Sequence, residues 1–141
     1  MLKKFFNKKK EQSSEHKNKP IIALIVHAAK IDEKYTEQEQ EIIKKVITQF
    51  NQIDFEESEK ILKIAEKAEE ESNQIIGFTK EIKKYPMELR LKIIEIIWKI
   101  VYSDGASDNY ESNLIRRICG LLYISDKDNG IIKTKVKNLL K

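Results

Sequence analysis

The sequence predicts an all-α fold, a compact bundle of about six to seven helices in which two pseudo-repeated helix groups surround two buried central helices. Two observations support this fold class. The 141 residues include only four glycines and two prolines, so residues that break helices are rare. Apolar residues recur at the helical period of 3.6, and no strand-like alternation of apolar and polar residues occurs. A chain of this length forms one domain with a substantial core.

Charge divides the chain into a basic flexible tail, residues 1–19, and a helical domain, residues 20–141. The tail holds seven lysines against two glutamates, so the remaining 122 residues carry a net charge of −1. Because the basicity belongs to the tail, no specific nucleic-acid binding is expected. Leu2, Phe5 and Phe6 lie among five lysines. This pattern fits a short amphipathic helix in peripheral contact with a membrane, and plain disorder explains it equally well.

The helical domain is predicted to begin with a buried helix. Pro20 suits the first position of a helix, and the residues from there to Ile31 are apolar nearly all round, which marks a central helix. Thr36 and Glu39 match the capping-box rule, so a second helix begins there and runs to about Phe50.

Two further helices complete the first half. Asp54 with Glu57 matches an N-cap followed by a helix. Ser72 or Asn73 is predicted to begin a shorter helix, which ends before Pro86 because the residue before a proline avoids the helical conformation.

The second half is predicted to repeat this plan. A second central helix covers about residues 87–103 and is almost wholly apolar. Asp108 with Glu111 caps the next helix, and Ser125 with Asp128 caps the last one.

An internal repeat relates the two halves. Residues 22–46 and 94–118 align without a gap at an offset of 72 residues, in polar as well as apolar positions. The matched polar pairs are Asp32 with Asp104, Thr36 with Asp108, and Glu39 with Glu111. Repeated helix pairs favour a pseudo-symmetric core in which the two apolar helices pack together. The alternative is chance similarity in an isoleucine-rich sequence.

The two acidic junctions, residues 32–39 and 104–111, are candidate functional sites. Helix capping explains four of their residues, namely Thr36, Glu39, Asp108 and Glu111. Capping does not explain Asp32 and Asp104, because each follows a helix, where a carboxylate meets the negative end of the helix dipole. A nearby cation would relieve this repulsion, as would a basic side chain. The basic candidates are Lys30, Arg116 and Arg117.

If a metal ion binds, the ligands are predicted from both junctions. They are Asp104, Asp108 and Glu111 in the second junction, and Asp32 and Glu39 in the first. Oxygen ligands select a hard divalent cation, Ca²⁺ or Mg²⁺, over a thiophilic one. The spacing does not match an EF-hand, so an open and weak site is expected.

The second junction resembles the TerB-like group of bacterial proteins, the tellurite-resistance type. An apolar helix ends at Asp104-Gly105, Asp108 and Glu111 follow, and the next helix carries Leu-Ile-Arg-Arg-Ile over residues 114–118. The resemblance covers about residues 20–140. The first half matches more loosely, since Glu33 stands where glycine is usual and Thr36 where an acid is usual.

The resemblance implies a non-enzymatic module with acidic residues that bind a divalent metal. It also implies a link to tellurite resistance and stress response through protein partners, in the cytoplasm and near the inner membrane. The alternative is a co-chaperone-like or scaffold interaction domain without metal. No small-molecule substrate is evident.

Other residues point away from an enzyme and from secretion. The sequence shows no nucleophile–base set and no phosphate-binding glycine loop. Its single cysteine, Cys119, fits an apolar stripe better than a nucleophile's position and excludes an internal disulfide, as in a reducing cytoplasm. We expect His27 to be a hydrogen-bonded core residue and Trp98 to lie in the core. No secretory signal or membrane-spanning segment is recognisable.

Overall fold

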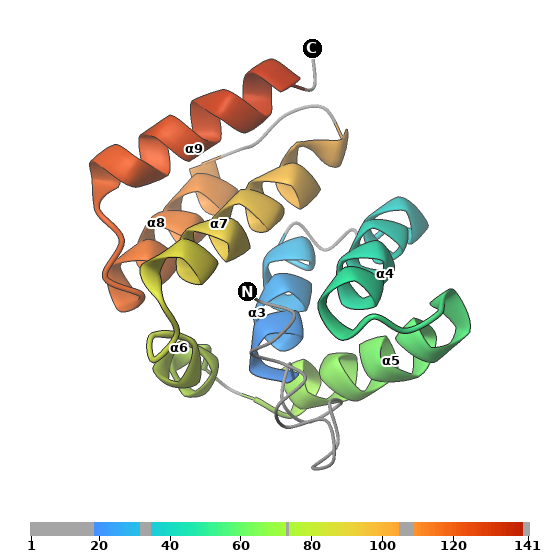
Figure 1. Ribbon diagram of the computed structural model, residues 1–141. Helices are drawn as coiled ribbons and strands as arrows, with labels where there is room; N and C mark the ends of the chain where they lie inside the picture. Colours follow the sequence, from blue (N-terminus) through green and yellow to red (C-terminus); the bar gives the residue numbers. More distant parts are fainter. Residues whose placement is uncertain (1–18, 32–34, 73, 105–108, 140–141) are drawn as a thin grey trace.

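The apolar stretch after residue 18 forms helix α3 (Lys19–Ala29), in which eight of eleven residues are buried. The structure is a computed structural model, and it describes residues 19–31, 35–72, 74–104 and 109–139. Helix α3 lies in the middle of the bundle with other helices around it (Figure 1). Helices α4 to α8 all pack against α3, which explains why its sequence is apolar on every side.

Within the described residues the regular structure is entirely helical, as predicted. After α3 come α4 (Glu37–Asn51), α5 (Phe55–Glu71), α6 (Ile76–Ile82), α7 (Met87–Val101), the short 3₁₀ helix η2 (Tyr102–Asp104), α8 (Asn109–Leu121) and α9 (Asp126–Leu139). The second central helix, α7, packs on α3, as the two apolar segments predict. One hydrophobic core draws on residues from both halves of the chain.

Local capping signals locate the starts of three helices. At α4 the predicted capping box forms between Thr36 and Glu39. Asp54 accepts a hydrogen bond from the backbone N–H of Glu57 at the start of α5 (2.9 Å). At α9 the hydroxyl of Ser125 accepts one from the N–H of residue 128 (3.1 Å). The predicted cap at Asp108 lies outside the described residues.

The start of α6 was predicted wrongly. Ser72 caps the C-terminal end of α5, and its hydroxyl donates to the carbonyl of Gln74 (2.7 Å), which favours a turn over a helix start. Asn73 lies outside the described residues. Helix α6 begins instead at Ile76, after Ile75, which makes no side-chain cap bond but is buried. Burial, rather than a capping side chain, therefore sets this start.

The end of the second central helix also differs from the prediction. The α-helix predicted to reach Ser103 ends at Val101 and tightens into η2, a common way for a helix to end. The hydroxyl of Ser103 donates to the carbonyl of Ile100 (2.6 Å) and so supplies a partner for one of the last carbonyls of α7.

The repeat extends over three helices in each half. Helices α3, α4 and α5 correspond in order to α7, α8 and α9, and α6 links the two groups (Figure 1). The described non-glycine residues with positive φ are Gln52 (54°) and Tyr123 (59°), and each stands two residues before the residue that caps the next helix, Asp54 or Ser125. Because both halves turn the chain in the same unusual way, the repeat is structural as well as sequential.

The N-terminal tail, residues 1–18, lies outside the described residues, so its amphipathic helix remains a prediction. None of the helices that the structure describes is long and apolar enough to cross a membrane.

Candidate functional site at the two acidic junctions

The first junction leads into α4 through a buried glutamate. Glu39 is 4% exposed, and its Oε1 accepts hydrogen bonds from the backbone N–H (2.8 Å) and the hydroxyl (3.1 Å) of Thr36. In return, the Thr36 hydroxyl accepts from the N–H of Glu39 (3.1 Å). This oxygen of Glu39 therefore holds the start of the helix, and any ion at the first junction would have to share it.

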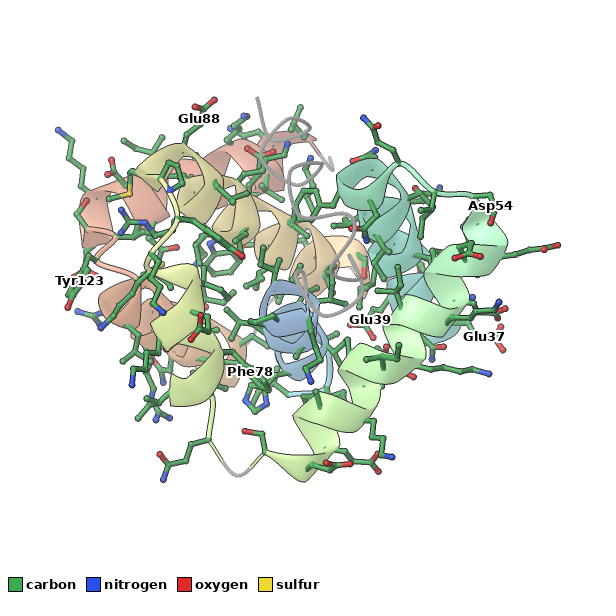
Figure 2. The ribbon with its side chains drawn as sticks, turned by 60° about the horizontal axis from the view of Figure 1, so that its bottom comes forward. Glu37, Glu39, Asp54, Phe78, Glu88 and Tyr123 are labelled. Carbon is green, nitrogen blue, oxygen red and sulfur yellow. The ribbon has the colours of Figure 1, made fainter. Side chains whose placement is uncertain are left out.

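The second junction leads into α8 through an equivalent glutamate. Glu111 lies in the first turn of α8 and is 5% exposed. Carboxylates are stabilised at this position because the N-terminal end of a helix carries partial positive charge. Each half of the molecule thus places one buried glutamate in the first turn of its second helix (Figure 2, where Glu39 is labelled).

The fold places the start of α4 beside η2. Gln38 of α4 donates from Nε2 to the backbone carbonyl of Ser103 in η2, at 3.5 Å. The N-terminal end of α4 therefore lies beside the C-terminal end of α7. The sequence contains no sign of this pairing, because the two residues are far apart in the chain.

The predicted ligands are only partly covered by the structure. The backbone of Asp104 ends η2. Asp32 and Asp108 lie outside the described residues, so the proposed ligand set stays a prediction. Within residues 19–31, 35–72, 74–104 and 109–139, no three histidine, cysteine, aspartate or glutamate side chains gather as a metal site would require.

Two basic residues expected near the junction acids pair with other helices. Lys30, just after α3, contacts Glu69 of α5 through Nζ and Oε1 at 2.8 Å. Arg116 of α8 pairs with Asp126 of α9 at 3.5 Å, and both of these side chains are exposed. The carboxylates that these two side chains contact, Glu69 and Asp126, both lie outside the acidic junctions.

Helix α5 fastens the first junction in place. Glu69 also contacts Nδ1 of His27 (3.0 Å), and the hydroxyl of Tyr35 donates to Glu66 (2.5 Å). Burial alone would raise the pKa of Glu69, but hydrogen bonds from Lys30 and His27 outweigh it and lower that pKa. Burial, followed by the bond to Glu66, raises the pKa of Tyr35 well above its usual range. Sequence reasoning missed all these contacts, because they join residues more than 30 positions apart.

A groove lies next to the contact between α4 and η2. It has a volume of about 430 Å³ and opens between α4, α7 and α9. Its lining is largely apolar, with Lys99 and two other polar residues: Gln38, Ile42, Lys99, Tyr102, Ser103, Val136 and Leu139. Because Gln38 and Ser103 both line the groove, a molecule bound there would touch the residues that join α4 to η2.

Two other predicted roles are confirmed and one is refined. Trp98 is 1% exposed, donates from Nε1 to Asn129 (2.9 Å) and stacks on Tyr102. Cys119 is fully buried, and burial, with a smaller contribution from Asp126, raises its pKa to about 12, so the thiol stays protonated at neutral pH. His27 is hydrogen-bonded as expected but is half-buried, at the edge of the core.

Comparison with known proteins supplies one match. The family model described as "Tellurite resistance protein TerB" matches residues 18–134, which is most of the chain and includes both junctions. No curated protein matches the sequence, and no solved structure does.

Proposed function

Since the chain belongs to the TerB family, we propose that it is a non-enzymatic binding module whose second acidic junction takes a divalent cation. In this proposal, the module acts in tellurite resistance or a related stress response through protein partners near the inner membrane. The observation that supports the proposal is the contact between Gln38 and Ser103, because it joins the start of α4 to η2, the segment in which the second junction begins.

The second junction is the better candidate for the ion. At the first junction, Glu33 stands where glycine is usual in the family and Thr36 stands where an acid is usual. The second junction offers three carboxylates within eight residues, Asp104, Asp108 and Glu111. Together with backbone carbonyls and water, these oxygen ligands suit Ca²⁺ or Mg²⁺. A bound cation would also balance carboxylates that follow the negative end of α7.

The non-enzymatic character rests on the chemistry of the described side chains. The thiol of Cys119 is buried and protonated, so it cannot serve as a nucleophile at neutral pH. Glu39, a buried carboxylate, forms the hydrogen bonds of a helix cap. Binding, rather than bond making, is the role that this arrangement supports.

Thermal unfolding of the full chain after metal removal tests the ion. Ca²⁺ or Mg²⁺ at 100 times its dissociation constant should add about 2.7 kcal/mol to the free energy of unfolding. For a domain of this size that amounts to a rise of several degrees in Tm. The double variant Asp104→Asn with Asp108→Asn should lose the rise, whereas Glu56→Gln with Glu57→Gln, which removes two exposed carboxylates from the first turn of α5, should keep it.

A different result would favour the alternative function. If neither millimolar Ca²⁺ nor Mg²⁺ shifts the Tm, the junction acids act as helix caps alone. The apolar groove between α4, α7 and α9 then favours a scaffold or co-chaperone-like role without metal. If the α5 control variant loses the rise as well, the ion binds diffusely to the acidic surface and not at the junction.

A further inference from the structure

The two halves of the helical domain carry opposite net charges. Residues 19–72 hold thirteen acidic and eight basic residues, whereas residues 73–141 hold eight acidic and thirteen basic ones. The near-zero net charge of the domain therefore conceals opposite charges on its two halves. In Figure 1, α4 and α5 of the acidic half lie on one side of α3, and α6, α8 and α9 of the basic half lie on the other.

The basic half presents a surface that we name the α6–α8 face. On α6 its exposed residues follow one side of the helix, and on α8 they follow the stripe opposite the core. These residues are Ile76 and Lys80 from α6, Lys83 and Lys84 from the turn that follows it, Arg116 and Arg117 from α8, and Tyr123 just after α8. The α6–α8 face thus combines five cations with two exposed apolar or aromatic side chains, Ile76 (46% exposed) and Tyr123 (68% exposed).

The α6–α8 face is one connected platform. Helix α6 packs against α8, and Nζ of Lys83 lies 5.6 Å from the centre of the Tyr123 ring. Arg90 donates to the carbonyls of Tyr85 (3.0 Å) and Leu122 (2.6 Å), which ties the turn after α6 to the end of α8. Figure 2 shows Tyr123 on the opposite side of the molecule from Glu37 and Asp54.

Three cations of this face remain available for an anionic partner. Lys84 pairs with Glu81 (3.3 Å), and Arg116 pairs with Asp126 (3.5 Å). Among the residues that the structure describes, Lys80, Lys83 and Arg117 form no ion pair. No carboxylate of the described residues therefore lies within ion-pair distance of these three cations.

We propose that the α6–α8 face binds the surface of a membrane that contains anionic phospholipids. The cations would meet the phosphate groups, while Ile76 and Tyr123 would enter the boundary between headgroups and acyl chains. A lipid surface uses both features, since tyrosine and aliphatic side chains gain free energy at this boundary. Phosphates of a nucleic acid would use the cations alone.

In this proposal, the basic tail provides a second attachment to the anionic membrane. Residues 1–18 contain six lysines together with Leu2, Phe5 and Phe6, and they precede α3 directly. Stable attachment to a membrane generally takes two such signals, because one alone binds only marginally. This inference does not depend on the cation at the junctions, so either can fail without the other.

Co-sedimentation of the full chain with lipid vesicles tests the proposal. The vesicles are phosphatidylcholine alone, or phosphatidylcholine with about one third phosphatidylglycerol. Each lysine or arginine near such a surface contributes enough that Lys80→Gln, Lys83→Gln and Arg117→Gln together should weaken binding to the anionic vesicles about tenfold or more. The matched triple Lys60→Gln, Lys63→Gln and Lys67→Gln removes three cations from α5, on the acidic side, and should change binding less than about twofold.

A second pair of variants separates lipid from nucleic acid. Ile76→Ser with Tyr123→Ser should weaken binding to anionic vesicles several-fold, whereas Phe55→Ser, on the exposed surface of α5, should not. If both triple variants lose vesicle binding to the same extent, net charge alone drives binding. If neither triple variant loses vesicle binding, the tail is the sole attachment. Retention of a DNA duplex that depends on Lys80, Lys83 and Arg117 while the vesicles go unbound would make the face a nucleic-acid site. Each of these results overturns the proposal.

Discussion

The two repeats share an apolar plan and differ in how their first and third helices are joined. In the first repeat the basic side chains come from the end of the first helix, where His27 of α3 and Lys30 just after it contact Glu69 of α5. In the second repeat the polarity is reversed, because Glu95 of α7 contacts Lys135 of α9 at 3.0 Å. The two halves therefore share the spacing of their buried apolar residues, whereas the ion pairs between their first and third helices differ.

The largest expected difference between the repeats concerns Trp98 and its counterpart, Val26. Both are buried, but only Trp98 stacks on an aromatic ring, lies under Nζ of Lys133 (5.1 Å) and donates a hydrogen bond to Asn129. Trp98→Ala should lower the free energy of unfolding by about 3–5 kcal/mol, because it leaves a large cavity. Val26→Ala should cost about 2 kcal/mol.

Urea unfolding followed by circular dichroism measures both values. Tyr123→Ala, at an exposed position, serves as the control and should change the free energy of unfolding little. A smaller cost for Trp98→Ala than for Val26→Ala would show that the second repeat does not depend on its tryptophan.

The second contrast between the repeats concerns how their ion pairs contribute to stability at low pH. Burial would raise the pKa of Glu95, but hydrogen bonds from Lys135, Lys99 and Lys92 outweigh it and lower that pKa to about 2. Because the folded pKa is depressed, the stabilisation by Glu95 is complete above its unfolded pKa of 4.5 and is lost as the pH falls towards 2. Glu95→Gln should therefore cost about 1 kcal/mol at pH 7, since the lysines are exposed, and nothing at pH 2.

Urea unfolding of the wild type and the variant between pH 2 and pH 7 checks this sign. Glu69→Gln gives the comparison in the first repeat and should follow the same direction, because hydrogen bonds lower the pKa of Glu69 as well. A cost that stays constant down to pH 2 would mean that the Glu95 side chain contributes through packing and not through charge.

The smallest expected effect is a gain in stability. Gln52 and Tyr123 both adopt the left-handed backbone conformation after a helix, which costs a residue with a side chain roughly 1 kcal/mol. Gln52→Gly and Tyr123→Gly should each stabilise the protein by about 0.5 kcal/mol after the loss of backbone entropy in glycine. Gln49→Gly, inside α4, should destabilise it by about 1 kcal/mol. A loss of stability in both C-terminal variants would show that side-chain contacts outweigh the backbone strain.

Sequence reasoning recovered the features that depend on neighbouring residues. The apolar helices, the capping box at Thr36 and the caps at Asp54 and Ser125 follow from spacing within one or two turns. The start of α6 escaped because Ser72 satisfies the pattern of a helix cap while it ends the preceding helix. The spacing of the Asp108 cap resembles the others, but that residue lies outside the described structure.

The candidate site was less accessible to the same reasoning. Both junctions were predicted as candidate sites, but the sequence does not reveal that Gln38 contacts Ser103, or that Glu66 and Glu69 contact residues at the first junction. Such contacts depend on how α4, α5 and α7 pack in space. The charge difference between the halves was visible in the sequence, yet the net charge of the whole domain concealed it.

The central position of α3 has a consequence for synthesis of the protein. Helices α7 and α8, which cover part of its apolar surface, follow it in the chain, so α8 is complete only roughly 90 residues after α3. At about 5–20 residues per second, a ribosome needs several seconds to supply them. During that time the most apolar helix of the nascent chain lacks its final cover, and this interval is when the protein is most prone to aggregate and most in need of a chaperone.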